Sequence, residues 1–289
     1  MQKNNGLDKN QLISFVIFSA ILMAFMFYFQ NKQSDEKQVA DAKAKTEQKV
    51  ASKTIANNIN ATVNAAAIKN VTVKNKELTL EFASLGGQLS SVEINQYKAY
   101  NAKTDKHDLP LYLIEKNNSS YGFQFKDKTG KTFNTKDLVF VPSVKDNTVT
   151  MTAQVSGATI QYVYQLLDNY TLDFNVKTQG LSSIVTDEKA DFHWNYTVRG
   201  MEKGRSQEQT HSEFNYAFDN YGSTDYDTNG FEEPEETLNW LAVKQQFFTS
   251  IIESTNGFTH AKGTQETIEK GEFLKKFNFE GQVKLAGNE

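Results

Sequence analysis

Apolar and polar side chains alternate with a period of two along most of the chain from about residue 70 onward. Because successive side chains of a β-strand point to opposite faces of a sheet, this alternation predicts half-buried strands. It marks residues 78–82, 109–113, 121–125, 149–155, 160–166, 170–176 and 192–198. We expect two further strands, around residues 273–279 and at the end of the chain. Turn residues separate these strands: Gly86 and Gly87 after the first, and Asp168 and Asn169 inside the clearest hairpin. The pattern predicts an antiparallel all-β domain over residues 70–289, either a sandwich or a large open barrel.

Residues 12–29 break this pattern, because these 18 consecutive residues contain no charge, glycine or proline. As an α-helix they would be about 27 Å long, close to the roughly 30 Å of a bilayer core. Lys3 and Lys9 precede the stretch, so we expect a single span with residues 1–11 in the cytoplasm. The competing interpretation is a cleaved signal peptide. The run is long for one, and it ends without a small-x-small cleavage site.

Residues 30–69 contain no glycine, proline or aromatic side chain and are rich in Lys, Ala, Gln, Asn and Asp. Such a segment cannot bury enough apolar area to offset the entropy lost on ordering. We therefore predict a flexible polar linker between the membrane helix and the β-domain.

Two later segments interrupt the alternation. In residues 201–236 acidic side chains outnumber the basic Lys203 and Arg205, which predicts a polar, acidic insertion. Residues 238–253 are the most apolar stretch after residues 12–29. Trp240, Val243 and Phe247 recur at helical spacing, so we expect a short helical turn that runs into a core strand.

Composition removes several classes of function. The chain has 289 residues, a formal net charge of −4 and no cysteine. Without cysteine, disulfides, thiolate metal sites and cysteine nucleophiles are excluded. The negative net charge argues against nucleic acid as a partner. Aromatic residues make up 12% of the chain, and this favours sheets.

The sharpest motif is a calcium-loop pattern. Asp225, Asp227, Asn229 and Glu236 satisfy the spacing of an EF-hand loop, with Gly230 at its turn position. Oxygen ligands at this spacing could cage Ca²⁺. No helical pattern precedes the loop, however, so the favoured interpretation is a solvated acidic hairpin tip. The calcium site remains a weak candidate.

No catalytic site is evident. The histidines, His107, His193, His211 and His260, have no paired metal-ligand spacing, and no nucleophile elbow or phosphate-binding loop occurs. We therefore predict no catalytic residue, no cofactor and no enzymatic activity.

Three features together resemble the N-terminal half of YidC, the bacterial membrane protein insertase. The first is the apolar helix followed by a polar linker. The second is the strand over residues 78–82 with the glycine pair and a following strand, and with Tyr97 beyond it. The third is Trp240-Leu-Ala-Val-Lys-Gln-Gln-Phe-Phe248, similar to the family's Trp-x-Ala-x-x-Gln-x-Tyr-Phe signature. The motif positions are Gly86, Gly87, Trp240, Gln246, Phe247 and Phe248.

The resemblance implies a periplasmic β-supersandwich of the galactose-mutarotase-like kind, hung from one helix in the bacterial inner membrane. It also implies the lipid bilayer, nascent membrane proteins and the Sec translocon with its accessory subunits as partners. In the family, a later helical bundle carries out insertion. We expect these 289 residues to lack that bundle and to act as a scaffold.

Two alternatives remain open. One is a membrane-anchored glycan-binding or sugar-modifying domain, suggested by the aromatic content and the implied fold. The other is a calcium-dependent envelope protein, which rests on residues 225–236 alone.

Overall fold

The computed structural model describes residues 69–218, 225–227, 230–233 and 235–285. The expected membrane helix at 12–29 and almost all of the expected linker at 30–69 lie outside this part. Among the described residues, no helix has the length and apolarity needed to span a bilayer.

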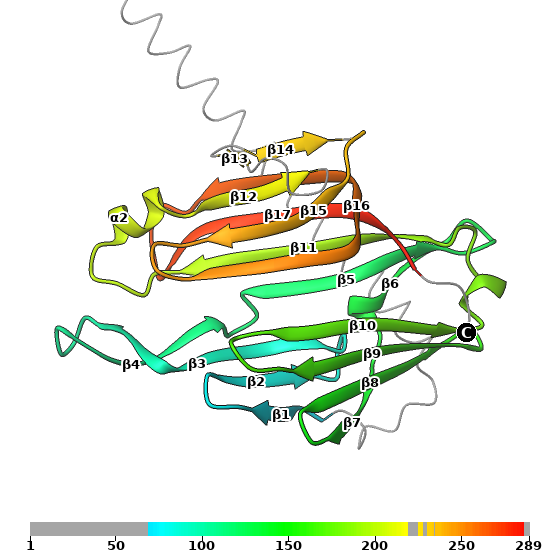
Figure 1. The fold of residues 1–289 in the computed structure, drawn as a ribbon, viewed down its shortest axis with the longest axis horizontal. Coiled ribbons are helices and arrows are strands. Elements are labelled where there is room, and N and C mark those ends of the chain that lie inside the picture. Colours follow the sequence, from blue (N-terminus) through cyan, green and yellow to red (C-terminus); the bar gives the residue numbers. More distant parts are fainter. Residues whose placement is uncertain (1–68, 219–224, 228–229, 234, 286–289) are drawn as a thin grey trace, which may run out of the picture. The chain divides into compact units, whose positions relative to one another are not determined.

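The described residues form three antiparallel sheets (Figure 1). The first has the order β1-β2-β3-β4, and the second the order β10-β9-β8-β7. The third has nine strands in the order β13-β12-β15-β16-β17-β11-β5-β6, with β14 paired to β16. The prediction of an antiparallel all-β fold is confirmed.

The first two sheets come from residues 71–179 of the chain. Their strands are β1 (Val71–Lys74), β2 (Leu78–Ala83), β3 (Gln88–Asn101), β4 (Lys106–Ile114), β7 (Val141–Lys145), β8 (Thr148–Val155), β9 (Ala158–Leu166) and β10 (Leu172–Gln179). The 3₁₀ turns η2 (Thr135–Asp137) and η3 (Leu181–Ser183) flank the second sheet in the chain.

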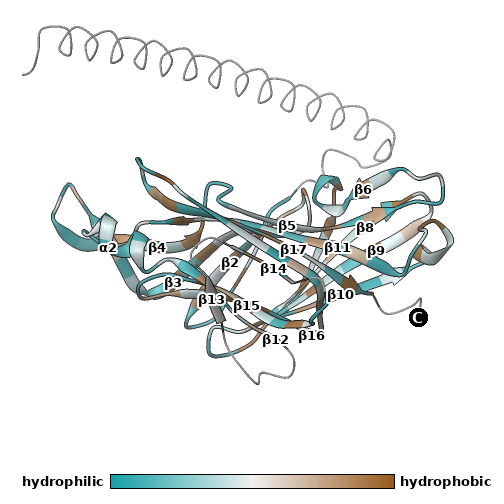
Figure 2. Cartoon of the chain, turned by 90° about the horizontal axis from the view of Figure 1, so that it is seen from above, coloured by the Kyte–Doolittle hydropathy of each residue, from teal (hydrophilic) through white to brown (hydrophobic). Residues whose placement is uncertain are grey.

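The third sheet takes most of its strands from the second half. They are β5 (Ser119–Lys126), β6 (Thr132–Asn134), β11 (Lys189–Arg199), β12 (Glu213–Phe218), β13 (Asp225–Asp227), β14 (Gly230–Glu233), β15 (Leu238–Lys244), β16 (Thr249–Thr267) and β17 (Phe273–Lys284). The short helix α2 (Arg205–Thr210) lies between β11 and β12 in the chain. Figure 2 shows hydrophilic colouring over α2 and the tip of the β3–β4 hairpin.

The predicted hairpin is formed as expected. Leu166 is opposite Leu172, and the pairing continues without a register shift to the far end of β10. The alternating apolar residues of β9, from Ala158 to Leu166, are all buried. The alternation therefore fixed both the strand and the face that it buries.

An aromatic core joins the sheets. The Phe123 ring on β5 lies 5.9 Å from Tyr162 on β9 and 6.3 Å from Phe174 on β10. Phe174 also stacks on Tyr164 with 4.6 Å between ring centroids. Aromatic side chains bury large apolar areas, and this accounts for the aromatic richness of the chain.

The glycine pair forms the turn that the sequence predicted. Gly86 and Gly87 have φ angles of 78° and 62°, where a side chain is strained. A Cβ on Gly87 would lie 2.7 Å from the Phe140 ring. Close packing of the turn on Phe140 therefore requires glycine at this position.

Two predictions about the second half were wrong. Residues 238–244 form the strand β15, not a helical turn, because Leu238, Leu241 and Val243 are buried between β12 and β16. The acidic insertion also contains a core strand, β12, in which Phe214 and Tyr216 are buried. The acidic side chains of this segment lie around that strand in sequence.

Candidate functional site

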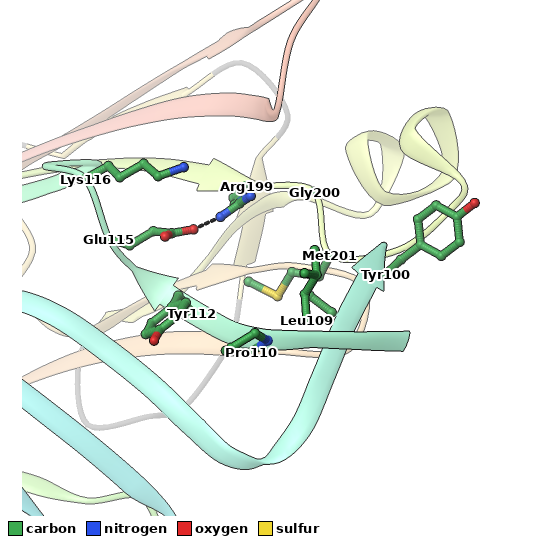
Figure 3. A pocket seen from close by; sticks show the side chains of 10 residues that line it. Tyr100, Leu109, Pro110, Tyr112, Glu115, Lys116, Arg199, Gly200 and Met201 are labelled. Carbon is green, nitrogen blue, oxygen red and sulfur yellow. Dashed lines mark ion pairs between the residues drawn. The ribbon is translucent and has the colours of Figure 1, made fainter. Parts of the chain in front are cut away.

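A cleft of about 190 Å³ lies between the β3–β4 hairpin and the end of β11 (Figure 3). Leu109 and Pro110 on β4 supply part of its apolar lining, with Met201 beyond β11. Polar lining comes from Tyr112 and from Glu115, Lys116 and Arg199. The cleft is therefore lined by both apolar and charged side chains, and the charged group is called the rim network below.

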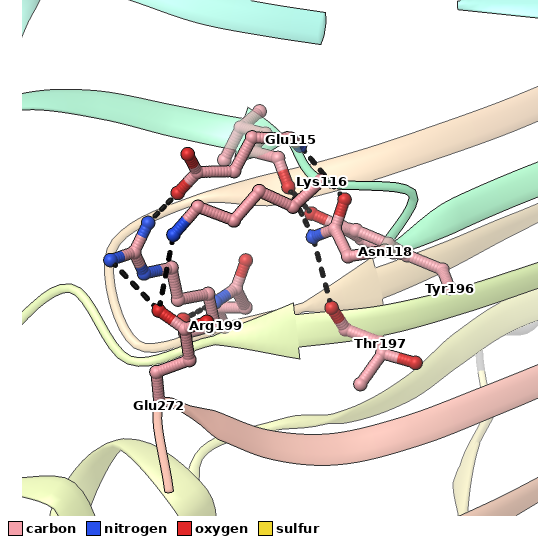
Figure 4. Close-up of polar contacts among 9 residues, drawn as sticks. Glu115, Lys116, Asn118, Tyr196, Thr197, Arg199 and Glu272 are labelled. Atoms are coloured by element: carbon pink, nitrogen blue, oxygen red, sulfur yellow. Dashed lines mark hydrogen bonds and ion pairs between the residues drawn. The ribbon is translucent and has the colours of Figure 1, made fainter. Parts of the chain in front are cut away.

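Four charged side chains form the rim network (Figure 4). Arg199 at the end of β11 is ion-paired with Glu115, which follows β4, and lies 3.1 Å from Glu272, which precedes β17. The amine of Lys116 lies 3.7 Å from the same Glu272 carboxylate. Two cations and two anions balance, so the network leaves no net charge to attract a charged ligand.

The β4–β5 loop is held by the buried Asn118. Its carboxamide oxygen accepts a hydrogen bond from the backbone of Glu115, and its nitrogen donates to the carbonyls of Leu113 and Thr197. Lys116 and Asn117 adopt positive φ angles of 52° and 61° to make this turn. Asn118 thus fixes the position from which Glu115 reaches Arg199.

The end of β11 is held by the backbone and by a glutamine. The strand register shifts between Val198 and Arg199, and the Gly200 amide donates to the Glu272 carbonyl at 2.9 Å. The buried Gln245 donates to the Arg199 carbonyl at 2.9 Å. Buried carbonyls require such partners, so Gln245 secures the strand end.

Helix α2 supplies a buried carboxylate behind the cleft. Glu208 is only 2% exposed and accepts a hydrogen bond from the backbone of Met201 at 2.8 Å. Burial raises the pKa of Glu208 above that of an ordinary glutamate. A Cβ on Gly200 would lie 3.2 Å from this carboxylate, so the small residue leaves room for it.

The predicted motif Trp240–Phe248 ends in the turn between β15 and β16. The ring of Phe248 packs edge-on against Tyr97 at 5.5 Å. Phe247 is 66% exposed and Tyr97 is 51% exposed. The motif turn therefore presents aromatic surface to solvent on one side and anchors Arg199 through Gln245 on the other.

Sequence reasoning named Gln246, which is half-buried, but the spacing of the signature counted from Trp240 places its glutamine at the buried Gln245. Sequence reasoning also missed Arg199, Glu115 and Glu208. No motif marks these three residues, because they come from separate segments that meet only in the fold.

The calcium-loop residues do not lie in a helix–loop–helix. Asp225 and Asp227 belong to β13, which pairs with β12, and the next strand, β14, pairs with β16. Asn229 lies outside the described residues, and Glu236 is exposed. No group of three or more metal-ligating side chains occurs in the part of the chain that the structure describes.

The histidines do not gather at the cleft. His107 lies 2.8 Å from Glu202, and His193 lies 3.5 Å from Glu280 on the neighbouring strand. The cleft itself is smaller than the roughly 300–1,000 Å³ of usual small-molecule pockets.

A family model for the YidC periplasmic domain matches residues 70–287. The chain belongs to the YidC periplasmic domain family. This match covers the three described sheets, and the resemblance inferred from the sequence motifs is confirmed.

Curated relatives carry the name membrane protein insertase YidC. The protein of Phocaeicola vulgatus is 28% identical over 94% of this chain and 47% of its own length. That of Parabacteroides distasonis is 26% identical over 96% of this chain and 49% of its own length. The chain spans about half the length of these YidC relatives.

Among solved structures, the fold is similar to a galactose mutarotase related enzyme from Lactobacillus acidophilus. The TM-score is 0.38 and the sequence identity 10%, over 76% of this chain and 87% of that one. A galactose mutarotase-like protein from Lactobacillus casei has a TM-score of 0.37 and 11% identity, over 76% of this chain and 91% of that one.

Proposed function

We propose that this chain is the periplasmic part of a YidC-type membrane protein insertase, and that it acts as a scaffold rather than as the insertion machinery. The observation that carries the proposal is the match of residues 70–287 to the YidC periplasmic domain. Relatives named as insertases support it, because they align with nearly the whole of this chain.

The proposal includes the setting of the domain. Residues 12–29 anchor the chain in the bacterial inner membrane with the N-terminus inside, and residues 30–69 tether the β-domain in the periplasm. The partners are the lipid bilayer, nascent membrane proteins and the Sec translocon with its accessory subunits. The domain uses no cofactor and catalyses no reaction.

The site geometry supports a docking role. The rim network is internally neutralised, the cleft is small, and the exposed rings of Tyr97 and Phe247 lie at the motif turn. Aromatic side chains of this kind are enriched among the residues that dominate binding at protein interfaces.

Photo-cross-linking from Phe247 tests this proposal. A photoreactive side chain replaces Phe247 in the full chain, which is expressed in a Gram-negative host. We expect adducts with inner-membrane proteins or Sec components. A matched probe at Thr129, exposed in the β5–β6 turn, should give fewer. Adducts restricted to soluble periplasmic proteins, or the same adducts from both positions, would contradict the scaffold role.

Labelling of single cysteines tests the topology, because the chain contains no cysteine of its own. With the outer membrane permeabilised, Thr129→Cys should react with an impermeant maleimide in intact spheroplasts. Asn5→Cys should react only after the inner membrane is broken. Reaction of Asn5→Cys in intact spheroplasts would overturn the proposed orientation.

One of the two observations that suggested glycan binding, the high aromatic content, has another explanation. The aromatic richness that suggested it is accounted for largely by the buried rings of the core, such as Phe123, Tyr162 and Tyr164. A glycan array probed with the full chain would restore this alternative if it gave saturable binding that Tyr112→Ala abolished.

A further inference from the structure

Strand β10 forms one edge of the second sheet. It pairs with β9 over all eight of its residues, and no described strand pairs with its other side. Edge strands usually carry a device that blocks further pairing, such as a proline, a bulge, a short length or charged side chains. The opposite edge strand, β7, is five residues long and contains Pro142. In β10 there is no proline and no register shift, and its exposed charges, Asp173 and Lys177, are of opposite sign rather than a single repelling sign.

The backbone of β10 presents hydrogen-bonding groups at this free side. The Leu167 amide donates to the Thr171 carbonyl, so Thr171 directs its polar groups toward β9. Along an antiparallel strand, successive residues direct their backbone amide and carbonyl groups alternately toward one neighbouring strand and toward the other side. Asp173, Asn175 and Lys177 therefore also face β9, whereas the amides and carbonyls of Leu172, Phe174, Val176 and Thr178 point outward.

The apolar side chains of β10 are less buried than those of the neighbouring strand β9. On β9, Tyr162 and Tyr164 are buried, but their partners Val176 and Phe174 on β10 are only half-buried. A further strand beside β10 would cover the apolar face that these two residues continue.

The exposed charged side chains of β10 are complementary to those of a second, antiparallel copy of β10. Asp173, Asn175 and Lys177 are exposed on the same face. If a second β10 runs antiparallel about a two-fold axis at Asn175, Asp173 of each copy lies opposite Lys177 of the other. Opposite charges at directly facing positions stabilise a strand pair, and like charges destabilise it. In this register, the residues whose backbone amides and carbonyls point away from β9 lie opposite each other in the two copies. Phe174 of one copy, for example, lies opposite Val176 of the other.

We propose that β10 is a self-association edge, which joins two copies of this chain through an antiparallel β10–β10 pair centred on Asn175. The two four-stranded sheets then form one continuous sheet of eight strands. This inference does not rest on the proposed function, because it uses only the edge, its burial and its charges.

Cross-linking of single cysteines in the full chain tests the register. At a non-hydrogen-bonded antiparallel pair the Cα atoms are about 4.5 Å apart, within the range that a disulfide spans. Asn175→Cys should therefore give a covalent dimer under mild oxidation in membranes and in detergent. Asp173→Cys should not, because the two copies of that residue lie about 13 Å apart along the pair.

Ser143→Cys on β7 is the matched control for the opposite edge of the same sheet. It should remain monomeric under the same oxidation. Dimers from Ser143→Cys with none from Asn175→Cys would place association at β7 and overturn the proposal. Equal yields at all three positions would indicate random collision and would also overturn it.

Charge reversal tests the same edge without cysteine. Asp173→Lys alone should lower the dimer fraction in sedimentation velocity by roughly tenfold, because two attractive pairs become repulsive. Lys177→Asp alone should act in the same way, and the double variant should recover dimer formation. An unchanged dimer fraction in both single variants, or a monomeric parent chain at every concentration tested, contradicts the proposal.

Discussion

Two regions of the domain are held together by different physical means. Around Tyr164, the contacts are between aromatic rings, and the Tyr164 hydroxyl bonds to the Tyr121 hydroxyl and to the carbonyl of Gly87. Around Arg199, charged side chains from three segments close the end of β11, with the buried Glu208 behind them.

The two regions differ in how they respond to pH. Burial raises the pKa of Tyr121 to about 12 and that of Tyr164 well above its ordinary value, so both hydroxyls stay neutral in any physiological medium. Burial also raises the pKa of Glu208, which brings a carboxylate closer to the range that cells experience. The aromatic region is thus expected to be rigid and indifferent to pH, and the charged region to be adjustable.

The largest expected effect is in the aromatic region. Tyr164→Ala should lower the free energy of unfolding by about 3–5 kcal/mol, because it leaves a cavity between Phe82 and Phe174. Urea unfolding followed by the fluorescence of Trp194 and Trp240 measures this. Tyr164→Phe keeps the ring and loses the hydrogen bonds to Gly87 and Tyr121, so it should cost about 1–2 kcal/mol. Equal losses in the two variants would mean that the hydroxyl, not packing, holds this region.

An intermediate effect is expected in the rim network. Arg199→Met should cost about 1–3 kcal/mol, because it leaves the largely buried Glu115 carboxylate without its cation. Because the Arg199 and Glu115 side chains are both partly exposed, this loss of stability should be smaller than the loss from breaking a fully buried ion pair. Lys116→Met, at a side chain 61% exposed, should change stability by less than about 0.5 kcal/mol in the same assay. If Arg199→Met lowers the free energy of unfolding no more than Lys116→Met does, the network does not contribute measurably to stability.

The smallest expected effect is the pH dependence at Glu208. Because its folded pKa is raised, the folded chain holds this proton more tightly than the unfolded chain does. Stability that is fully present below the ordinary glutamate pKa is therefore lost as the pH rises through the raised folded value. Glu208→Gln, which does not titrate, should remove this part of the pH profile of unfolding.

Glu269→Gln, at an exposed position, is the control for this profile and should leave it unchanged. A Glu208→Gln profile parallel to that of the parent chain between pH 4 and pH 7 would show that the buried carboxylate does not titrate there.

Much of the fold could be read from local patterns. The alternation in β8, β9 and β10 identified both the strands and the buried face, and the glycine pair identified its turn. Strand β12 was overlooked although Phe214, Tyr216 and Phe218 alternate in it, because the surrounding acidic residues dominated the interpretation. Trp240 and Val243 in β15 and Phe247 in the following turn fit a helical period by chance, and pairing of residues 238–244 with β12 and β16 makes this segment a strand.

The candidate site could be read only in part. The motif from Trp240 to Phe248 pointed to the turn that supports it, but the rim joins residues 115, 116, 199 and 272 of the chain. Nothing in the local sequence indicates which glutamate will meet Arg199.

The sequence by itself determined the strand pattern, the aromatic core and the family, because these follow from side-chain periodicity and short motifs. The tertiary structure alone decided the strand order, the free edge of β10, the rim network and the burial of Glu208. Each of these depends on contacts between residues far apart in the chain, and those contacts exist only once the sheets have packed.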